Sequence, residues 1–192
     1  VYISDYDDTV KVSYSHKTLR KASYVTKKLY FSGMVDFYKL VTSEQNLEIV
    51  TASPVFLLPL IKSAMSYNNF SANRIFARDR VEDKFEYKVR LIEELMNERP
   101  GDEFILLGDN GGSDEDVFTF LRYTYPEKVL AAYIRPLKNK KMDTKVLTPY
   151  FSALDLAYYE YKADRLDYTG YLALAKKVAS DDMGRIIPED YE

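Results

Sequence analysis

Short apolar runs that alternate with longer amphipathic stretches are the feature that most limits how this chain folds. After an opening run at residues 1–4, the runs are "LEIVT" ending at Thr51, "RIFA" ending at Ala77, "FILLG" ending at Gly108 and "VLAAYI" ending at Ile134. Short runs that are apolar throughout are typical of parallel strands buried on both faces, with helices as the connections between them. The sequence therefore predicts a doubly wound α/β fold, a three-layer sandwich around a central parallel sheet of about five strands.

Several connecting stretches carry clear helix signals. In "SPVFLLPLIKSAM", Ser53 stands at a natural N-cap position and Pro54 at the first helical position. Between residues 82 and 99, apolar side chains recur at spacings of four, three and four residues, at Phe85, Val89, Ile92 and Met96. This periodicity indicates an amphipathic helix. The tyrosine-rich stretch 148–178 predicts two further helices.

The length of 192 residues fits one domain. We expect residues 1–150 to form the core sheet with its helices, and residues 151–192 to add helices packed on that core. No run approaches the roughly 18 consecutive apolar residues of a membrane span, so we expect a soluble or peripherally membrane-associated protein. The chain starts at Val1 inside an expected strand, so we expect upstream residues, such as a targeting peptide, and leave the compartment open.

Composition excludes several kinds of chemistry. The chain has no cysteine, which rules out disulfides, thiolate nucleophiles and cysteine zinc sites. A single histidine, His16, argues against a Ser-His-Asp triad or a multi-histidine metal site. No glycine-rich phosphate loop or dinucleotide fingerprint occurs among the seven glycines. If this protein is an enzyme, carboxylates, hydroxyls and lysines must carry its chemistry.

Polar side chains follow four of the expected strands, at the edge where ligands bind in sheets of this kind. They are Asp5, Asp7 and Thr9 after the first strand, Thr51 and Ser53 after the second, Arg78 and Asp79 after the third, and Asp109 and Asp114 after the fourth. Carboxylates placed side by side repel one another unless a cation offsets their charge. We therefore expect a metal ion at this edge of the sheet.

Two of these clusters match motifs of a known superfamily. "SDYDDTV" resembles the first motif of the haloacid dehalogenase (HAD) phosphohydrolases, D-x-D-x-T after a strand, and "FILLGDNGGSDEDVF" resembles the fourth, G-D-x-x-x-x-D. In the same order, "FSGMVDFYKL", "VTASP", "IFARD", "YKVRLIEEL" and "LLGDNGGSDEDVF" resemble the patterns of the App1-type phosphatidate phosphatase catalytic domain (DUF2183). The resemblance covers nearly the whole chain and implies a HAD-like Rossmannoid sandwich with a minimal cap.

The resemblance implies a role for each carboxylate. Asp5 would attack phosphorus and form an aspartyl-phosphate, while Asp7 would protonate the leaving group and then deprotonate water. Magnesium, which prefers oxygen ligands, would be held by Asp5, the backbone carbonyl of Asp7, and Asp109. Asp114 would orient a metal-bound water.

Hydroxyls and an arginine complete the substrate-binding set that the resemblance implies. Thr51 would hydrogen-bond the phosphate as the second motif. The further candidates for substrate contacts are Thr9, Ser53 and Arg78. The N-cap position of Ser53 explains that residue without a function.

The third motif needs a lysine, and both Lys84 and Lys88 are available. At about 100° per residue, Lys88 projects roughly 60° from Phe85, on the core-facing side of its helix. Lys84 lies nearer the helix start, where solvation explains it. We therefore expect Lys88 to neutralise charge between Asp5 and the phosphate.

Each acidic cluster also has a purely structural explanation. Asp7 and Asp8 are residues that form turns, and Asp114 and Asp116 are suited to the start of a helix, where they complement its dipole. Two such clusters after neighbouring strands favour the functional interpretation.

Charge is unevenly distributed along the chain. The formal net charge is −3, yet residues 11–35 hold six lysines and arginines and no acid. A second basic stretch, "RPLKNKKMDTK", follows the fifth strand. Both stretches are explained by solvated faces, but they could also attract the enzyme to an anionic membrane surface. Together with the App1-like motif order, they make phosphatidate the first substrate candidate.

Other functions stay open at this point. The chain could be a phosphatase for another phosphomonoester, such as a nucleic-acid end, a phosphoprotein or a small metabolite, or a non-catalytic module that binds phosphate or lipid. The basic, tyrosine-interleaved segment 11–30 is the feature that favours nucleic acid, although core packing explains its tyrosines with fewer assumptions. The sequence does not fix the oligomeric state.

Overall fold

The computed structural model describes residues 1–14, 26–79 and 81–187. Strands and helices alternate along the chain as far as Arg135, as the apolar runs predict. In order they are β1 (Tyr2–Ser4), α2 (Met34–Val41), η1 (Glu44–Asn46), β2 (Leu47–Pro54), η2 (Val55–Leu57), α3 (Leu58–Tyr67), β3 (Arg74–Arg78), α4 (Lys84–Glu98), β4 (Phe104–Asp109), α5 (Asp114–Thr124), β5 (Val129–Arg135), β6 (Thr148–Pro149), α6 (Ala153–Lys162), α7 (Tyr168–Ala179) and α8 (Met183–Ile186), where η marks a 3₁₀ helix.

All strands of the sheet are parallel, in the order β3-β2-β1-β4-β5-β6, which confirms the predicted α/β class. The sheet has six strands, one more than expected. The extra strand, β6, has only two residues, too few for an apolar run to reveal it, and Pro149 is tolerated because β6 is an edge strand. In the centre, Ser4 of β1 pairs with Ile49 of β2 and Leu107 of β4, so the carboxyl ends of these three strands meet.

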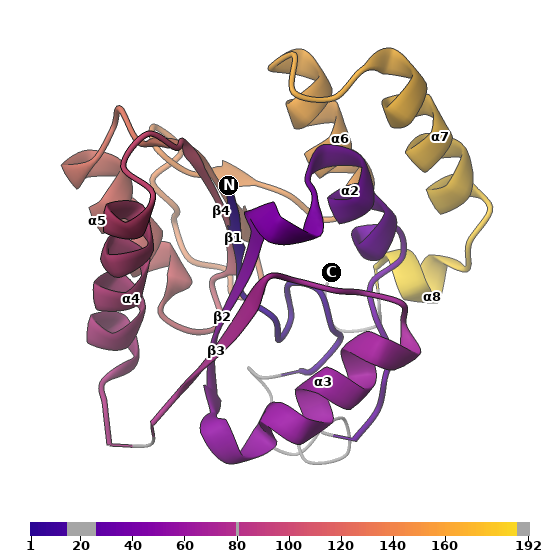
Figure 1. Ribbon diagram of the computed structural model, residues 1–192. Helices are drawn as coiled ribbons and strands as arrows, with labels where there is room; N and C mark the ends of the chain where they lie inside the picture. Colours follow the sequence, from indigo (N-terminus) through magenta and orange to yellow (C-terminus); the bar gives the residue numbers. More distant parts are fainter. Residues whose placement is uncertain (15–25, 80, 188–192) are drawn as a thin grey trace.

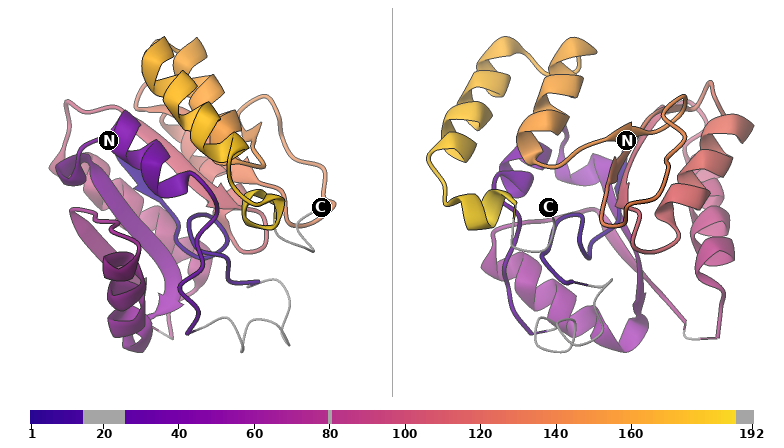
Figure 2. Two further views of the ribbon diagram at one scale, coloured as in Figure 1. Left: turned by 90° about the vertical axis from the view of Figure 1, so that its right-hand side faces the viewer. Right: turned by 180° about the vertical axis from the view of Figure 1, so that it is seen from behind.

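Helices cover both faces of the sheet and make a three-layer sandwich (Figure 1 and Figure 2). α4 and α5 pack on one face, and α2, α3, α6 and α7 lie on the other. Because successive strand residues point to opposite faces, Tyr2 belongs to the core beneath α2 and Ile3 to the core beneath α4. With both faces covered, ligands can reach the sheet at the end where its strands terminate.

β2 is longer than expected, and the prediction that Ser53 caps a helix is wrong. The strand runs to Pro54, η2 follows, and α3 begins only at Leu58, with Leu57 as its N-cap residue. Pro54 has φ −62° and ψ 145°, an extended conformation that suits proline as well as a helix start does. The hydroxyl of Ser53 instead bonds to a side chain of the loop after β1.

The predicted helix between residues 82 and 99 is α4, which Asp83 caps by accepting hydrogen bonds from the N–H groups of Phe85 and Glu86. Its buried face is rotated from the predicted one, because Phe85 and Val89 are only partly buried. The buried side chains are Tyr87, Lys88, Leu91, Ile92, Leu95 and Met96. Lys88 lies within this buried face. Because the analysis of apolar periodicity counts lysine as polar, it does not predict this face.

A buried glutamate ties the predicted C-terminal helices to the sheet. Glu160 of α6 accepts hydrogen bonds from the hydroxyls of Tyr2 and Tyr133, each at 2.6 Å. Its carboxylate also pairs with Arg165 at 2.7 Å. Since Tyr2 lies on β1 and Tyr133 on β5, one carboxylate joins two strands, α6 and the α6–α7 connection.

We expect Glu160→Gln to lower the free energy of unfolding by roughly 3 kcal/mol, because the amide keeps only one acceptor oxygen for three donors and leaves a partly buried arginine without its counter-charge. Urea denaturation measures this difference. The matched control is Glu98→Gln, which removes an exposed carboxylate from Arg74 and should change the free energy by no more than about 0.5 kcal/mol. Equal losses in the two variants would contradict the assigned role of Glu160.

Candidate active site

A cavity of about 340 Å³ opens at the carboxyl ends of the central strands. Its wall is made by Asp5, Asp7, Thr51, Ala52, Ser53, Pro54, Phe56, Leu57, Arg78, Lys84, Lys88, Asp109, Gly112, Ser113 and Asp114. Nearly every side chain that the sequence predicts for the site therefore lines one cavity, although these residues are far apart in the sequence. Thr9 is the exception.

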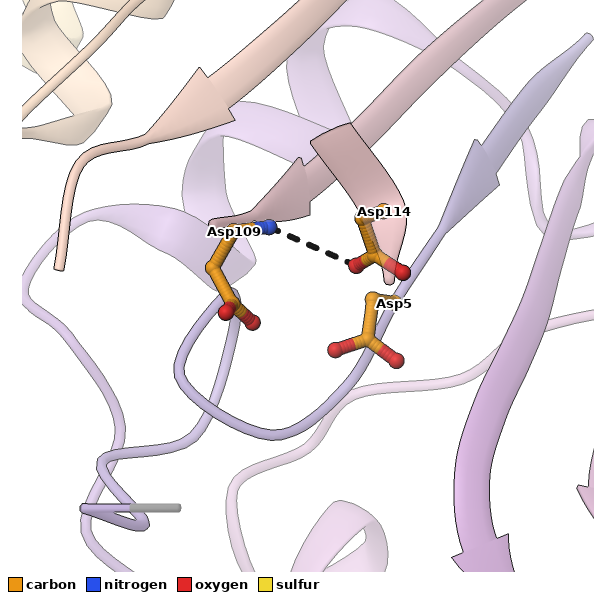
Figure 3. Close-up of side chains that lie close together, drawn as sticks. All are labelled: Asp5, Asp109 and Asp114. Atoms are coloured by element: carbon orange, nitrogen blue, oxygen red, sulfur yellow. Dashed lines mark hydrogen bonds between the residues drawn. The ribbon is translucent and has the colours of Figure 1, made fainter. Parts of the chain in front are cut away.

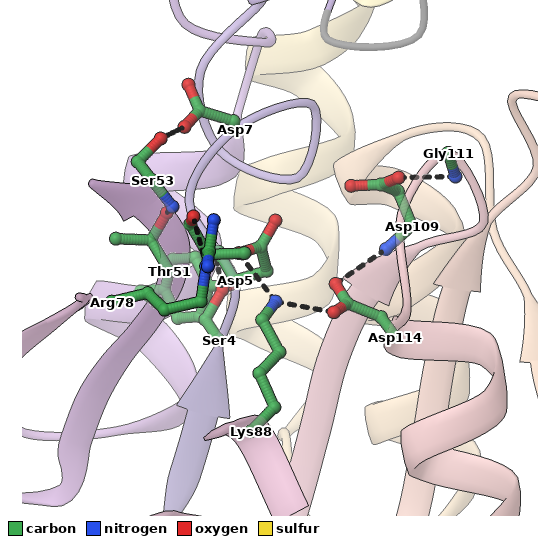
Figure 4. A network of polar contacts seen from close by, with 12 residues as sticks. Ser4, Asp5, Asp7, Thr51, Ser53, Arg78, Lys88, Asp109, Gly111 and Asp114 are labelled. Carbon is green, nitrogen blue, oxygen red and sulfur yellow. Dashed lines mark hydrogen bonds and ion pairs between the residues drawn. The ribbon is translucent and has the colours of Figure 1, made fainter. Parts of the chain in front are cut away.

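Lys88 lies between two carboxylates inside the cavity (Figure 4). Its Nζ atom is 2.9 Å from Asp5 Oδ1 and 2.5 Å from Asp114 Oδ1, and all three side chains are buried. Burial disfavours the charged lysine, but the carboxylates of Asp114 and Asp5 outweigh it and raise the pKa of Lys88 above its usual range. The lysine that reaches Asp5 is therefore Lys88, whereas Lys84 lies exposed at the rim.

Asp5, Asp109 and Asp114 form a compact acidic cluster, in which one oxygen of each lies within 4.8 Å of the others (Figure 3). Burial raises the pKa of Asp5 to about 7, a shift that Lys88 opposes and Asp114 reinforces. Burial also raises the pKa of Asp109 well above its usual range, and Asp114 and Asp5 add to that effect. The single ammonium group of Lys88 thus leaves the negative charge of the cluster incompletely offset.

This set of donors fits a hard divalent cation. All three groups are carboxylates, and the ions that prefer such oxygen ligands are Mg²⁺ and Ca²⁺. The raised pKa values indicate a shortage of positive charge that such an ion would supply. The residues that could hold it are Asp5, Asp109 and Asp114. The Asp7 carboxylate lies outside this cluster, so the predicted contribution of Asp7 remains that of its backbone carbonyl.

Close packing at the end of β4 positions two of these carboxylates. A Cβ atom on Gly108 would clash with the Asp114 carboxylate, so only glycine lets this carboxylate fold back against the strand. Asp114 Oδ2 accepts the N–H of Asp109 at 3.4 Å, and Asp109 Oδ1 accepts the N–H of Gly111 at 2.6 Å. The sequence prediction omits Gly108, although a glycine inside an apolar strand directly before Asp109 is a signal for it.

Two serine hydroxyls hold the side chain of Asp7, and Figure 4 shows the one from Ser53. Ser13 Oγ donates to Asp7 Oδ1 at 2.5 Å, and Ser53 Oγ donates to Asp7 Oδ2 at 2.6 Å. The N–H of Ser53 in turn donates to Thr51 Oγ1 at 3.0 Å. The Asp7 carboxylate is therefore fixed apart from the acidic cluster. Sequence reasoning misses Ser13, because nothing in the sequence shows that the loop after β1 folds back on Asp7.

Asp8, to which the sequence assigns no role, organises this loop. Its side chain is fully buried, and Oδ1 accepts the N–H groups of Ser13 and Tyr14, both at 2.8 Å. Asp8 has φ 61°, a left-handed conformation that aspartate tolerates better than most residues do. Thr9 is also fully buried and does not line the cavity. The chain reversal at Asp8 buries the Thr9 side chain, and a substrate contact by Thr9 remains a prediction.

Arg78 lines the cavity, but its guanidinium group bonds to backbone carbonyls. Nε donates to the carbonyl of Ala52 at 3.3 Å. Nη1 donates to the carbonyls of Asp79 and Glu82. These bonds tie the end of β2 to the turn between β3 and α4, and a substrate contact by Arg78 remains a prediction.

The basic stretches predicted to flank the site are only partly exposed. Lys11 and Arg135 are buried, and the Arg135 guanidinium lies 3.8 Å from the centroid of the Phe31 ring. Half of the cations in the first stretch lie within 15–25, outside the described residues, and the predicted minimal cap also falls partly there. In the second stretch the exposed lysines are Lys138, Lys140, Lys141 and Lys145.

Across the ranges that the structure describes, no helix is both long and apolar enough to span a membrane.

Comparisons with known proteins agree with this geometry. Residues 1–136 match the family described as phosphatidate phosphatase APP1, catalytic domain. The chain is 26% identical over 156 residues to phosphatidate phosphatase APP1 of Saccharomyces cerevisiae, an alignment that covers 73% of this chain and 26% of the yeast protein. The match thus spans about a quarter of that relative's length. No solved structure gives a significant match. The matched residues include the whole acidic cluster and Lys88. This chain belongs to the phosphatidate phosphatase APP1 catalytic-domain family.

Proposed function

We propose that this chain is a magnesium-dependent phosphomonoesterase of the HAD type that works through an aspartyl-phosphate on Asp5. The position of Asp5 carries the proposal: its carboxylate lines an open cavity, lies 2.9 Å from the Lys88 ammonium, and sits beside two further carboxylates. This arrangement suits a nucleophile for phosphorus, since the ammonium and a bound cation offset the repulsion between a carboxylate and a phosphate. Membership of a phosphatase family supports the same reaction class.

The proposed reaction has two displacements. In the first, an oxygen of Asp5 bonds to phosphorus while the bond to the leaving oxygen breaks, and Asp7 gives that oxygen a proton. In the second, water bonds to phosphorus as the bond to Asp5 breaks, and Asp7 takes a proton from the water. Throughout, Lys88 neutralises negative charge between Asp5 and the phosphate. Magnesium, when bound, would supply further positive charge to the phosphate oxygens.

Each remaining group has a part in holding the reactants. Asp109 and Asp114 would bind the metal, and the hydroxyl of Thr51 would donate to the phosphate. Ser13 and Ser53 keep the Asp7 carboxylate in one orientation, which a group that gives and takes a proton requires.

Phosphatidate is the substrate we propose first. The yeast relative is named a phosphatidate phosphatase, and Phe56 and Leu57 give the cavity an apolar wall that suits a lipid better than a sugar. Nucleic acid is disfavoured, because two of the three tyrosines that would have to stack on bases, Tyr14 and Tyr30, are buried in the core. The third, Tyr24, lies outside the described residues.

Replacement of the proposed nucleophile should abolish turnover. We expect Asp5→Asn to lower kcat for magnesium-dependent hydrolysis of an aryl phosphate by at least about a thousandfold, because an amide cannot form the covalent intermediate. The matched control is Asp79→Asn, which changes an exposed aspartate directly after β3 and outside the cavity, and which should retain activity. Turnover by Asp5→Asn at the rate of the control would rule out the mechanism.

Magnesium should stabilise the protein through the acidic cluster. At a hundred times its Kd, an ion that binds only the folded chain adds about 2.7 kcal/mol, which raises Tm by roughly 5–10 °C for a protein of this size. Asp109→Asn should lose most of this rise. Without metal the same variant should be more stable than the native protein, because burial and the neighbouring carboxylates raise the pKa of Asp109, so that its ionised form disfavours folding at neutral pH.

The control for this measurement is Asp116→Asn, which removes an exposed carboxylate from the first turn of the same helix, α5, and should keep the full rise in Tm. Differential scanning calorimetry with and without magnesium measures both variants. If magnesium still raises the Tm of Asp109→Asn by the full amount, the ion binds at another site.

Phosphatidate should be a better substrate than its soluble headgroup. Phosphate release from phosphatidate in mixed micelles should exceed that from glycerol 3-phosphate in kcat/KM by at least about tenfold, because the acyl part meets the apolar cavity wall. A preference for the soluble ester would reject the lipid assignment and keep the phosphatase assignment. No turnover of either ester or of an aryl phosphate would indicate a non-catalytic binding module.

A further inference from the structure

Arg135 is a buried cation to which the proposed reaction gives no part. It ends β5, is 3% exposed, and has no carboxylate partner among the residues that the structure describes. Lys88, by contrast, lies between two carboxylates. A guanidinium group that is removed from water without a carboxylate partner destabilises a fold, and an apolar side chain of similar size would pack at a lower cost. The charge of Arg135 therefore indicates a role beyond packing.

The guanidinium group of Arg135 contacts two aromatic rings and two backbone carbonyls. It lies 3.8 Å from the centroid of the Phe31 ring and 4.7 Å from that of the Tyr150 ring. Nη2 donates to the carbonyl of Thr9 at 3.4 Å, and Nη1 donates to the carbonyl of Phe151. The rings restrict the position of the planar group, so its two bonds fix both carbonyls relative to β5.

Thr9 belongs to the turn that carries Asp7, the proposed acid and base. The turn is compact, because the carbonyl of Tyr6 accepts the N–H groups of Val10 and Lys11, both at 3.0 Å. Thr9 lies inside this closed turn, two residues after Asp7. A displacement of the Thr9 backbone therefore moves Asp7 with it.

The turn is held from two strands that are not neighbours in the sheet. From β2, the hydroxyl of Ser53 donates to the Asp7 carboxylate at 2.6 Å. From β5, the side chain of Arg135 donates to the backbone of the turn. The backbone carbonyl of Arg135 also accepts the N–H of Asn110, the residue after Asp109, at 3.1 Å. Arg135 thus connects the turn that carries the proposed acid to the loop that begins at the acidic cluster.

We propose that Arg135 is a positioning residue of the phosphatase reaction, which holds the turn so that the Asp7 carboxyl group can give its proton to the leaving oxygen. This inference rests on the proposed function, because Asp7 is an acid only in that reaction. In the first displacement the bond between phosphorus and the leaving oxygen breaks, and a proton passes from Asp7 to that oxygen. Without Arg135 the turn shifts and this proton transfer slows.

The test compares two esters that differ in their need for a proton. Hexyl phosphate releases an alkoxide, which needs a proton as it leaves, whereas nitrophenyl phosphate releases a stable phenolate, which does not. In Arg135→Met, kcat/KM should fall at least about tenfold further for hexyl phosphate than for nitrophenyl phosphate, because a misplaced acid acts only on the ester that needs it. A purely structural role would lower both values by the same factor, because it reduces the amount of active enzyme.

The matched control is Arg122→Met. Arg122 of α5 also donates to two backbone carbonyls, those of Val129 and Val146. Val129 begins β5, at the opposite end of the strand from Arg135. The control should keep the ratio of the two kcat/KM values within about twofold of the native ratio, because Arg122 does not touch the turn.

Two further variants connect the effect to Asp7. Asp7→Asn removes the acid itself and should show the same selective loss, and Arg135→Met should add no further selective loss in the double variant with Asp7→Asn. Arg135→Lys keeps the charge but loses the planar fork, and should show a selective loss of at least about threefold. Circular dichroism checks the fold of each variant, and Arg135→Lys takes the place of Arg135→Met if the latter does not fold.

Three results would overturn the inference and leave the proposed function standing. They are an equal fall for both esters in the Arg135 variants beside a selective fall in Asp7→Asn, a selective fall in Arg122→Met as large as that in Arg135→Met, and a full further selective loss in the double variant. If Asp7→Asn itself shows no selective loss, Asp7 is not the acid, and the proposed mechanism fails together with the inference.

Discussion

Three buried carboxylates around one buried lysine are the constraint on which the rest of this structure depends. The four side chains come from four different elements: Asp5 follows β1, Asp109 ends β4, Asp114 begins α5 and Lys88 lies on α4. They meet only because β1 and β4 are neighbours in the sheet and because α4 and α5 cover the same face. The strand order buries apolar surface and also places like charges together at one edge of the sheet. These like charges do not stabilise the fold.

Two other buried carboxylates show what a structural role looks like in this chain. Glu160 accepts hydrogen bonds from two tyrosines and pairs with Arg165, and Glu48 accepts hydrogen bonds from Asn73 and Arg74. Each is matched by donors on neighbouring elements. The acidic cluster is different, because the pKa values of its members Asp5 and Asp109 are raised even with Lys88 beside them. An incompletely matched cluster that opens into a cavity points to a ligand that brings positive charge, and this physical contrast separates the candidate site from the scaffold.

Local pattern was sufficient to predict the class of fold and most of the cavity wall. Apolar runs identify buried strands, and the ends of neighbouring parallel strands must meet, so residues after the strands are brought together without knowledge of any contact. Prediction failed where a non-local contact overrides local preference. Ser53 has the sequence context of a helix cap, but it lies in the extended strand β2, where its hydroxyl donates a hydrogen bond to Asp7. The need for glycine at Gly108 appears only once the Asp114 carboxylate is placed against it.

The central claim is that Asp5 is the nucleophile, and trapping the phosphorylated enzyme tests it most directly. The variant Asp7→Asn, mixed with an aryl phosphate whose leaving group needs no proton, should accumulate the aspartyl-phosphate, because the water that hydrolyses it lacks a base. Acid quenching followed by peptide mass spectrometry should then find a phosphoryl group on Asp5. Release of the aryl alcohol with no phosphoryl group on Asp5 at any quench time would contradict the account.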